Sequence, residues 1–291
     1  MSRTSKFRWT QERAEQFESG HRRIREVASL AHKSVRPLIR MTYGRPEQIG
    51  SGTLVSIRGA RFIFTAAHVL DWFDGEGVYL AGDGVLVPLA VTAERTNPPA
   101  GAARDQDRID AAVLRITNDI GDPPGTQFLE ASQLDVREWM DPADHYLLYG
   151  YPLAKTIVDP TTKRIAGDRL QILVPAGTQD DASRVGVHRD LHVVFAIDPK
   201  RMVSDAGIRA MPSPRGLSGG GVWAIRGLSD PEAVVSASLV GIFIEIPVGS
   251  KTAVATRVCY HFELIRTAWP EIGESLPKHG RAPIRLRRAT P

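Results

Sequence analysis

The feature that most constrains the fold of this chain is a series of short apolar runs separated by turn residues. The runs are rich in Val, Ile, Leu, Phe and Tyr, and Gly, Pro or Asp stand between them. Examples are VRPLIRM, TLVSI and RFIFT in the first half, and YLLYG, LQILV and HVVFAI in the second. Many short strands at close spacing are typical of a β-sandwich or β-barrel, since parallel sheets need long crossovers between strands. We therefore predict an all-β body, in which GVLVPLAVTAE at 84–94 forms one strand.

A stretch with few strand-like runs, at roughly 118–142, separates two β-rich halves, and a short helix is expected there around SQLDVREWM. Helical or basic segments lie at both ends. The predicted segments are an N-terminal helical extension at 1–33, a first β-barrel at 34–125, an inter-barrel connection at 126–142, a second β-barrel at 143–256, a C-terminal helix at 257–275 and a basic tail at 276–291.

Two helices are predicted from apolar spacing. The first covers 10–33, where apolar residues recur at helical intervals and form one stripe: Ala14, Phe17, Ile24, Val27 and Leu30. The second covers 257–269 and ends at Pro270, because proline inside a helix removes a hydrogen bond and clashes with the preceding turn. We place His261 of this second helix near the surface.

The composition is that of an ordinary globular protein, with 42% hydrophobic and 24% charged residues among 291. No apolar run approaches the roughly 20 residues that cross a bilayer, and the first residues lack the apolar core of a secretory signal. Cys259 is the only cysteine, which excludes an internal disulfide and a zinc site built on several cysteines. We therefore expect a cytoplasmic protein that does not associate with a membrane.

The net charge of +4 is unevenly distributed along the chain. Residues 1–40 carry +6 and residues 276–291 carry +5, so the body at 41–275 carries −7. A basic end can contact nucleic acid or an acidic partner, and it can also serve only as a solubilising tail. Both interpretations stay open.

Three segments carry residues suited to nucleophilic catalysis. His68 lies in TAAHVL directly after an apolar run, Asp110 leads the run DAAVLRI, and Ser218 lies in GLSGGGV. A serine hydroxyl needs a base within hydrogen-bond reach, and a histidine can accept its proton. A carboxylate fixes the tautomer of that histidine. The surrounding glycines allow the amides of Gly216 and Ser218 to point at one spot, where an oxyanion would develop.

Each of these residues alone has a simpler explanation. A single His after a strand is commonly a packed or surface residue, a single Asp there caps a turn, and GLSGGG is compatible with a flexible turn. The combination is more specific, because His68, Asp110 and Ser218 occur in this order and come from both halves of the chain. A site between two barrels would require that arrangement.

These segments resemble the chymotrypsin-like (trypsin-like) serine peptidases, particularly their disulfide-free bacterial branch. GSGTLVSIRGARFIFTAAHVL, DAAVLRI, GYP at 150–152 and GLSGGGV match successive motifs of that family, over roughly residues 34–269. The resemblance implies two six-stranded antiparallel β-barrels with the active site between them. It also implies that His68 is the general base, Asp110 orients it, and Ser218 is the nucleophile of a serine endopeptidase. Gly216 and Ser218 would supply the amides of the oxyanion hole.

The departures from the family concern control and specificity. Leu217 stands where zymogen-activated members have an aspartate that pairs with a new N-terminus, so control by that cleavage is not expected. The resemblance puts Pro212 at the base of the specificity pocket and Ile244 and Glu245 in a strand that lines it. We expect small or medium apolar substrate side chains, a protein or peptide substrate, a regulatory partner protein, no cofactor and no metal.

Two other functions are considered. G-x-S-x-G is also the pattern of α/β-hydrolases, and a serine esterase of that fold would use Ser218, Asp230 and His261 in chain order. That fold requires alternating strands and helices ahead of the serine, which residues 34–215 do not supply. The second alternative is a protease-like binding module that no longer cuts, since a fold alone does not guarantee activity.

Overall fold

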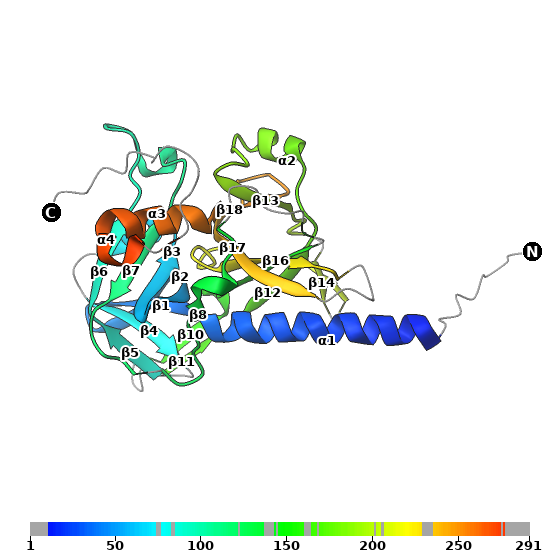
Figure 1. Cartoon of the computed structure of the whole chain (residues 1–291), viewed down its shortest axis with the longest axis horizontal. Helices are drawn as coiled ribbons and strands as arrows, with labels where there is room; N and C mark the ends of the chain where they lie inside the picture. The colour runs from blue at the N-terminus through cyan, green and yellow to red at the C-terminus, as the bar shows by residue number, and fades with distance from the viewer. Residues whose placement is uncertain are drawn as a thin grey trace, which may run out of the picture.

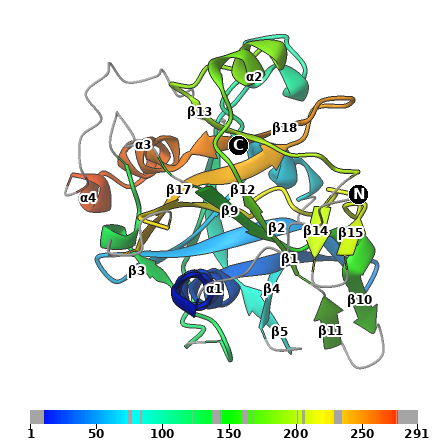
Figure 2. The same cartoon turned by 90° about the vertical axis from the view of Figure 1, so that its right-hand side faces the viewer.

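The computed structural model describes residues 11–73, 77–82, 85–121, 123–136, 143, 145–159, 164–167, 169–200, 202–204, 207–228, 235–274 and 276. Most of the predicted basic tail, and Asp230 of the esterase alternative, lie outside the described residues. Two curled β-sheets form the body, and Figures 1 and 2 show them packed side by side. In Figure 1, the C-terminal end of α1 lies at the first sheet and the rest of the helix runs past the second.

The first sheet has eight strands in the order β5-β4-β1-β2-β3-β7-β6, with β8 paired to β2. All pairs are antiparallel except that between β2 and β8. The strands are β1 (Val35–Thr42), β2 (Arg45–Ile57), β3 (Ala60–Thr65), β4 (Val78–Gly82), β5 (Val85–Leu89), β6 (Val91–Arg95), β7 (Ala112–Ile116) and β8 (Leu129–Glu130).

Two tight turns set the register of the first three strands. Tyr43 (φ 51°) and Gly44 (φ 75°) join β1 to β2. Arg58 (φ 52°) and Gly59 (φ 79°) join β2 to β3. Positive φ at both central residues matches the right-handed twist of a hairpin. These turns thereby align the buried faces of three neighbouring strands.

The first sheet differs from the prediction at Ala90, where the expected single strand 84–94 divides into β5 and β6. These two strands lie at opposite ends of the sheet order, so the chain between them closes the curl. Asn118 holds the break, because its side chain accepts a hydrogen bond from Ala90 N at 2.8 Å and donates one to Pro88 O at 3.2 Å. This division and the short β8 account for two strands beyond the expected six.

The second sheet has six strands in the order β12-β9-β16-β17-β18-β13, all antiparallel. They are β9 (His145–Gly150), β12 (Leu170–Val174), β13 (His192–Ala196), β16 (Gly221–Arg226), β17 (Ser236–Glu245) and β18 (Thr252–Arg257). A bridge between Ala176 and Phe195 brings the chain after β12 against β13 and closes this curl too. The prediction of an all-β body with two curled antiparallel units is confirmed.

Two small hairpins and several single turns complete the β-rich part. The hairpins are β10 (Thr156–Asp159) with β11 (Arg164–Gly167), and β14 (Met202–Ser204) with β15 (Gly207–Arg209). The turns are the 3₁₀ helices η1 (Ala67–Trp72), η2 (Arg104–Gln106), η3 (Ala131–Gln133) and η4 (Leu153–Lys155), and the short helix α2 (Gln179–Arg184).

The connection between the two sheets contacts both of them. It contributes β8 to the first sheet, and Leu134 then forms a bridge with Leu239 of β17. Asp135 forms an ion pair with Arg226 of β16, with 2.9 Å between Asp135 Oδ2 and Arg226 Nη2. Of the expected short helix, only the start is helical, as the 3₁₀ turn η3. Leu134 is extended and bridges to β17, so the helix does not continue there, and the part from residue 137 lies outside the described residues.

The terminal helices are α1 (Gln11–Ser34), α3 (Val258–Ala268) and α4 (Pro270–Gly273). Pro270 follows the end of α3 and occupies the first turn of α4, where its missing N–H costs nothing. Although α3 follows the second sheet, it packs on the first as well, with Phe262 edge-on to Phe64. None of the helices in the described residues is long and apolar enough to span a membrane.

His261 corrects the expectation of a surface position. Its side chain is fully buried and stacks on Phe64 of β3, with 5.0 Å between ring centroids. Its Nε2 lies 3.1 Å from Thr65 O, and because a carbonyl can only accept, Nε2–H is the donor. Apolar spacing placed the helix correctly but could not show that both sides of α3 are covered.

Candidate active site

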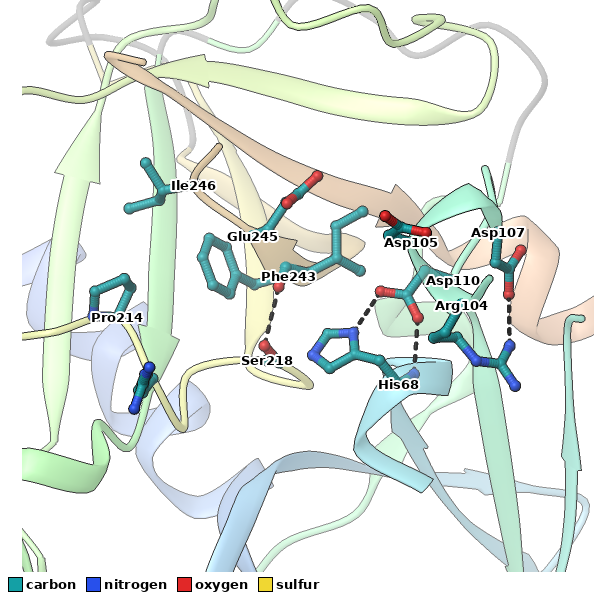
Figure 3. A pocket seen from close by; sticks show the side chains of 12 residues that line it. His68, Arg104, Asp105, Asp107, Asp110, Pro214, Ser218, Phe243, Glu245 and Ile246 are labelled. Carbon is teal, nitrogen blue, oxygen red and sulfur yellow. Dashed lines mark hydrogen bonds and ion pairs between the residues drawn. The ribbon is translucent and has the colours of Figure 1, made fainter. Parts of the chain in front are cut away.

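A cavity of about 430 Å³ contains all three residues singled out by the motifs: His68, Asp110 and Ser218. Its walls come from both sheets, since η1 and the chain before β7 supply His68 and Asp110, while the loop before β16 supplies Ser218. Figure 3 shows the imidazole of His68 between Asp110 and Ser218. Residues that are 150 positions apart in the chain thus meet across the contact of the two sheets.

Asp110 holds His68 with both carboxylate oxygens. Oδ2 lies 2.6 Å from His68 Nδ1, and Oδ1 accepts the backbone N–H of His68 at 2.9 Å. The carboxylate accepts a hydrogen bond from Nδ1–H, which leaves Nε2 as the basic nitrogen. The side chain of Asp110 is 13% exposed and that of His68 is 36% exposed, so the free edge of the ring remains accessible.

Asp110 adopts a left-handed backbone conformation, with φ of 53°. Asp tolerates this region better than most residues, and such strain persists only where the surroundings support it. Two contacts provide that support: Ala67 N donates to Asp110 O at 3.2 Å, and the buried hydroxyl of Thr256 donates to Ile109 O. The second contact comes from β18 and therefore crosses between the sheets.

Burial and nearby charge act on the pKa of His68 in opposite directions. Burial opposes protonation, but the hydrogen bond and negative charge of Asp110, with smaller effects of Asp71 and Glu245, outweigh it and raise the pKa of His68. An imidazolium formed during a reaction would be stabilised by the same charges.

The loop before β16 depends on its glycines. Gly216 and Gly219 have φ of 90° and 93°, in the region that favours glycine. A Cβ on Gly219 would lie 1.8 Å from Ser51 O, so no other residue fits without rearrangement. Leu217 between them is fully buried in the apolar core of the second sheet. Leu217 thus anchors the loop by apolar packing.

The remaining polar backbone groups of this loop are almost all used. Arg215 O accepts from Leu153 N at 2.7 Å, Leu217 N donates to Pro214 O at 3.0 Å, and Leu217 O accepts from Gly220 N at 2.8 Å. Gly219 N and Gly220 O pair with Phe243, while the carbonyls of Gly216, Ser218 and Gly219 accept from Ser51 and Thr53.

Between Arg215 and Gly220, only the N–H groups of Gly216 and Ser218 have no partner among the described residues. The carbonyl of each of their peptides is fixed, at Arg215 and at Leu217. Because C=O and N–H point in opposite directions in a trans peptide, both N–H directions are fixed as well. Two pre-oriented, unpaired amides are what an oxyanion hole requires.

The hydroxyl of Ser218 does not point at His68. It donates a hydrogen bond of 2.9 Å to Ile244 O, as Figure 3 shows. A rotation of its side chain is needed to bring Oγ to Nε2, and catalytic hydrogen bonds often form only when substrate is bound. The other potential nucleophile, Cys259, is buried, and burial raises its pKa to about 12. Ser218 therefore remains the better candidate.

The expected specificity residues are only partly brought together. Ile244 and Glu245 line the cavity, whereas Pro212 is not among its lining residues and Pro214 is. The turn closed by the Leu217 N to Pro214 O bond places Pro214 at the wall. Partial burial and the charge of Asp110 raise the pKa of Glu245, although His68 lowers it.

A charged network beside His68 did not emerge from the sequence. Asp71 accepts from Arg95 at 2.6 Å and from Arg104 at 3.0 Å, and Arg104 also pairs with Asp107 at 3.1 Å. Asp107 is further bonded by the Thr96 hydroxyl at 2.6 Å. These residues come from three separate segments of the sequence, at 71, at 95–96 and at 104–107, and no local pattern indicates that they would meet.

Comparison with solved structures identifies the fold. Neuropsin, a serine protease expressed in the limbic system of mouse brain, is 18% identical over 82% of this chain and 93% of its own, with a TM-score of 0.51. A scabies mite inactivated protease paralogue is 14% identical over 84% and 97%, with a TM-score of 0.53. Human heparin binding protein is 15% identical over 86% and 95%, with a TM-score of 0.51.

No protein-family model and no curated protein matches the chain. Likeness at this level of identity identifies a fold, and that fold is the chymotrypsin-like one. The α/β-hydrolase fold, which the esterase alternative required, is therefore not the fold of this chain.

Proposed function

We propose that this chain, which has the chymotrypsin-like fold, is a serine endopeptidase that forms an acyl-enzyme on Ser218. The observation that carries the proposal is the pairing of His68 with Asp110 in the same cavity as Ser218, whose loop presents two unpaired amides. A base, a nucleophile and an oxyanion site together are suited to acyl transfer.

The reaction would begin when Ser218 Oγ leaves Ile244 O and attacks the substrate carbonyl. His68 Nε2 takes the hydroxyl proton, Asp110 stabilises the imidazolium, and the amides of Gly216 and Ser218 bind the oxyanion. The C–N bond then breaks, the amine leaves with the proton from Nε2, and the acyl group remains on Oγ. Water, deprotonated by Nε2, hydrolyses this ester and restores Ser218.

The cavity suggests a substrate class but no single substrate. Phe243, Ile244 and Ile246 contribute to the wall near Ser218, which supports the expectation of small or medium apolar side chains. Arg215 and Glu245 lie at the same cavity and are exposed, so charged groups of a peptide could also be accommodated. The single, buried cysteine supports the expectation of a cytoplasmic, reducing environment.

A binding module without catalysis is the second candidate. Two of the solved neighbours are named an inactivated protease paralogue and a heparin binding protein, so the fold alone does not separate cleavage from binding. The bond from Ser218 Oγ to Ile244 O would favour such a module if that bond persisted with substrate bound.

Reaction with a fluorophosphonate, followed by mass spectrometry of the peptides, separates the two. We expect labelling at Ser218 and cleavage of fluorescent casein, both lost in Ser218→Ala with about a 10⁶-fold fall in kcat and an unchanged Tm. Ser183→Ala, at an exposed serine of α2, is the control and should label like the wild type. Absence of labelling in the folded wild-type protein would favour the binding module.

A further inference from the structure

Ser51 of β2 is fully buried and lies beneath the loop that carries Ser218. We propose that Ser51 is a positioning residue that holds the Gly216–Leu217 peptide, and so keeps the oxyanion amides of Gly216 and Ser218 directed at the substrate. The proposal rests on the proposed function, because it assigns Ser51 a part in the same reaction.

Ser51 joins three separate segments through four hydrogen bonds. Its Oγ donates to Gly216 O at 2.7 Å and accepts from Tyr151 N at 3.0 Å. Its backbone N donates to Ser218 O at 2.8 Å, and its backbone O accepts from the Thr65 hydroxyl at 2.9 Å. One residue of the first sheet therefore contacts the loop of the second sheet twice and the end of β3, three residues before His68.

The hydroxyl is fully committed to these partners. A serine has one O–H proton, and here that proton is directed at Gly216 O. The other donor near this carbonyl, Gln48 Nε2, is 3.5 Å away and makes a shorter bond of 2.7 Å to Tyr151 O. Ser51 is thus the main hydrogen-bond donor to the Gly216 carbonyl, while the N–H of the same peptide, on Leu217, donates to Pro214 O at 3.0 Å.

This carbonyl matters because its peptide lies between the two oxyanion amides. Each peptide is rigid, and the loop can change only by rotation about φ and ψ. Gly216 has no Cβ to restrict such rotation. Without the bond from Ser51, only the bond from Leu217 N to Pro214 O within the loop would hold this peptide, and a rotation that strained that bond would displace the N–H of Gly216 relative to that of Ser218.

The proposal separates two effects of removing the hydroxyl. A lost buried hydrogen bond lowers stability wherever it occurs. A disordered oxyanion site slows the chemical step while leaving the initial binding of a reagent unchanged. The second effect is specific to a positioning role.

The test compares Ser51→Ala with Ser34→Ala. Ser34 is also fully buried, and its hydroxyl donates to Leu30 O at 2.9 Å at the end of α1, outside the cavity. For each protein, the maximal rate of fluorophosphonate labelling (kinact), the half-saturating concentration (KI) and the Tm are measured. We expect a lower Tm in both variants. Only in Ser51→Ala should kinact also fall, by about 10- to 100-fold, with KI changed less than twofold.

The pH dependence of labelling provides an independent readout. Its rising limb should keep its position in Ser51→Ala, because the contact between His68 and Asp110 does not involve Ser51. If Ser51→Ala fails to fold, Ser51→Cys replaces it, and its weakly donating thiol should still lower kinact at least threefold.

A kinact within twofold of wild type in folded Ser51→Ala would overturn the proposal, as would equal losses of kinact in Ser51→Ala and Ser34→Ala. So would an unchanged kinact in Ser51→Cys, where that variant is needed. Failure of the wild-type protein to label at Ser218 would instead contradict the proposed function on which this inference rests.

Discussion

The two sides of the cavity are built in different ways. On the side of the first sheet, side chains form the site: Asp110 binds His68 through two hydrogen bonds, and the pair is already assembled. On the side of the second sheet, the backbone forms the site. Glycines at positive φ orient the two amides of the oxyanion site, while the Ser218 hydroxyl points at Ile244 O. The first side depends on charge and the second on the space available to the backbone.

Each side is nevertheless held by donors from beyond its own sheet. The hydroxyl of Thr256 in β18 supports Ile109 next to Asp110, and His261 of α3 supports Thr65 before His68. In return, Ser51 of β2 supports the loop of Ser218. Because of these hydrogen bonds between the sheets, neither half of the site would keep its geometry if the two sheets separated.

Among the variants that compare the two sides of the cavity, the largest effect is expected from the charge of Asp110. Asp110→Asn keeps the size of the side chain but removes the negative charge and no longer fixes Nδ1–H, so kcat should fall about 10⁴-fold with little change in Tm. Peptide hydrolysis and thermal melting measure the two quantities. Asp180→Asn, at an exposed position of α2, is the control. A loss below tenfold would mean that the first side does not depend on charge.

The backbone side should respond to Gly219→Ala. A Cβ at this position would lie 1.8 Å from Ser51 O and 2.3 Å from the Thr65 hydroxyl, at a φ of 93°. We expect a loss of about 4 kcal/mol or more in the free energy of unfolding, measured in urea.

The control for Gly219→Ala is Gly59→Ala. Gly59 has a φ of 79°, and a Cβ added there would have no neighbouring atom within 4 Å. This variant should cost only the backbone strain of about 1 kcal/mol. Equal losses in the two variants would show that steric contact with the first sheet does not matter.

The buried support of the His68 segment should appear in the pH dependence of stability. Burial lowers the pKa of His261 to about 4, although its hydrogen bond to Thr65 O opposes this. An unfolded histidine titrates near 6.5, so between these two pH values the unfolded chain binds more protons and stability falls as pH falls.

His261→Gln retains a neutral donor and removes this titration. The wild-type protein should therefore lose about 3 kcal/mol more than His261→Gln between pH 7 and pH 4. Urea unfolding at both pH values measures the difference. Parallel losses in the two proteins would contradict a neutral, buried His261.

The smallest effect is expected from Glu245→Gln. Glu245 contributes to the raised pKa of His68, but less than Asp110 does. Because the base must be neutral, activity rises as pH passes upward through this pKa, and removing the charge of Glu245 should move that limb to lower pH. A limb that stays in place or moves to higher pH would show that Glu245 does not act on His68 through its charge.

The sequence predicted the β-rich body for a local reason. Side chains alternate along each strand, and the turns at Tyr43–Gly44 and Arg58–Gly59 connect neighbouring strands directly. The motifs around His68, Asp110 and Ser218 were found in the same way, because glycines and apolar neighbours mark each of them within a few residues. The approximate positions of α1 and α3 also followed from local spacing.

Contacts between distant segments arise only from the tertiary structure. Apolar periodicity could not show that α3 would be covered on the side of His261, because the covering residue, Phe64, is almost 200 positions earlier. Nor could it show that Ser51 would meet Gly216, or that the Ser218 hydroxyl would turn to Ile244 O. A local pattern determines which residues a chain offers to a site, whereas hydrogen-bond partners and burial arise only when two closed sheets pack together.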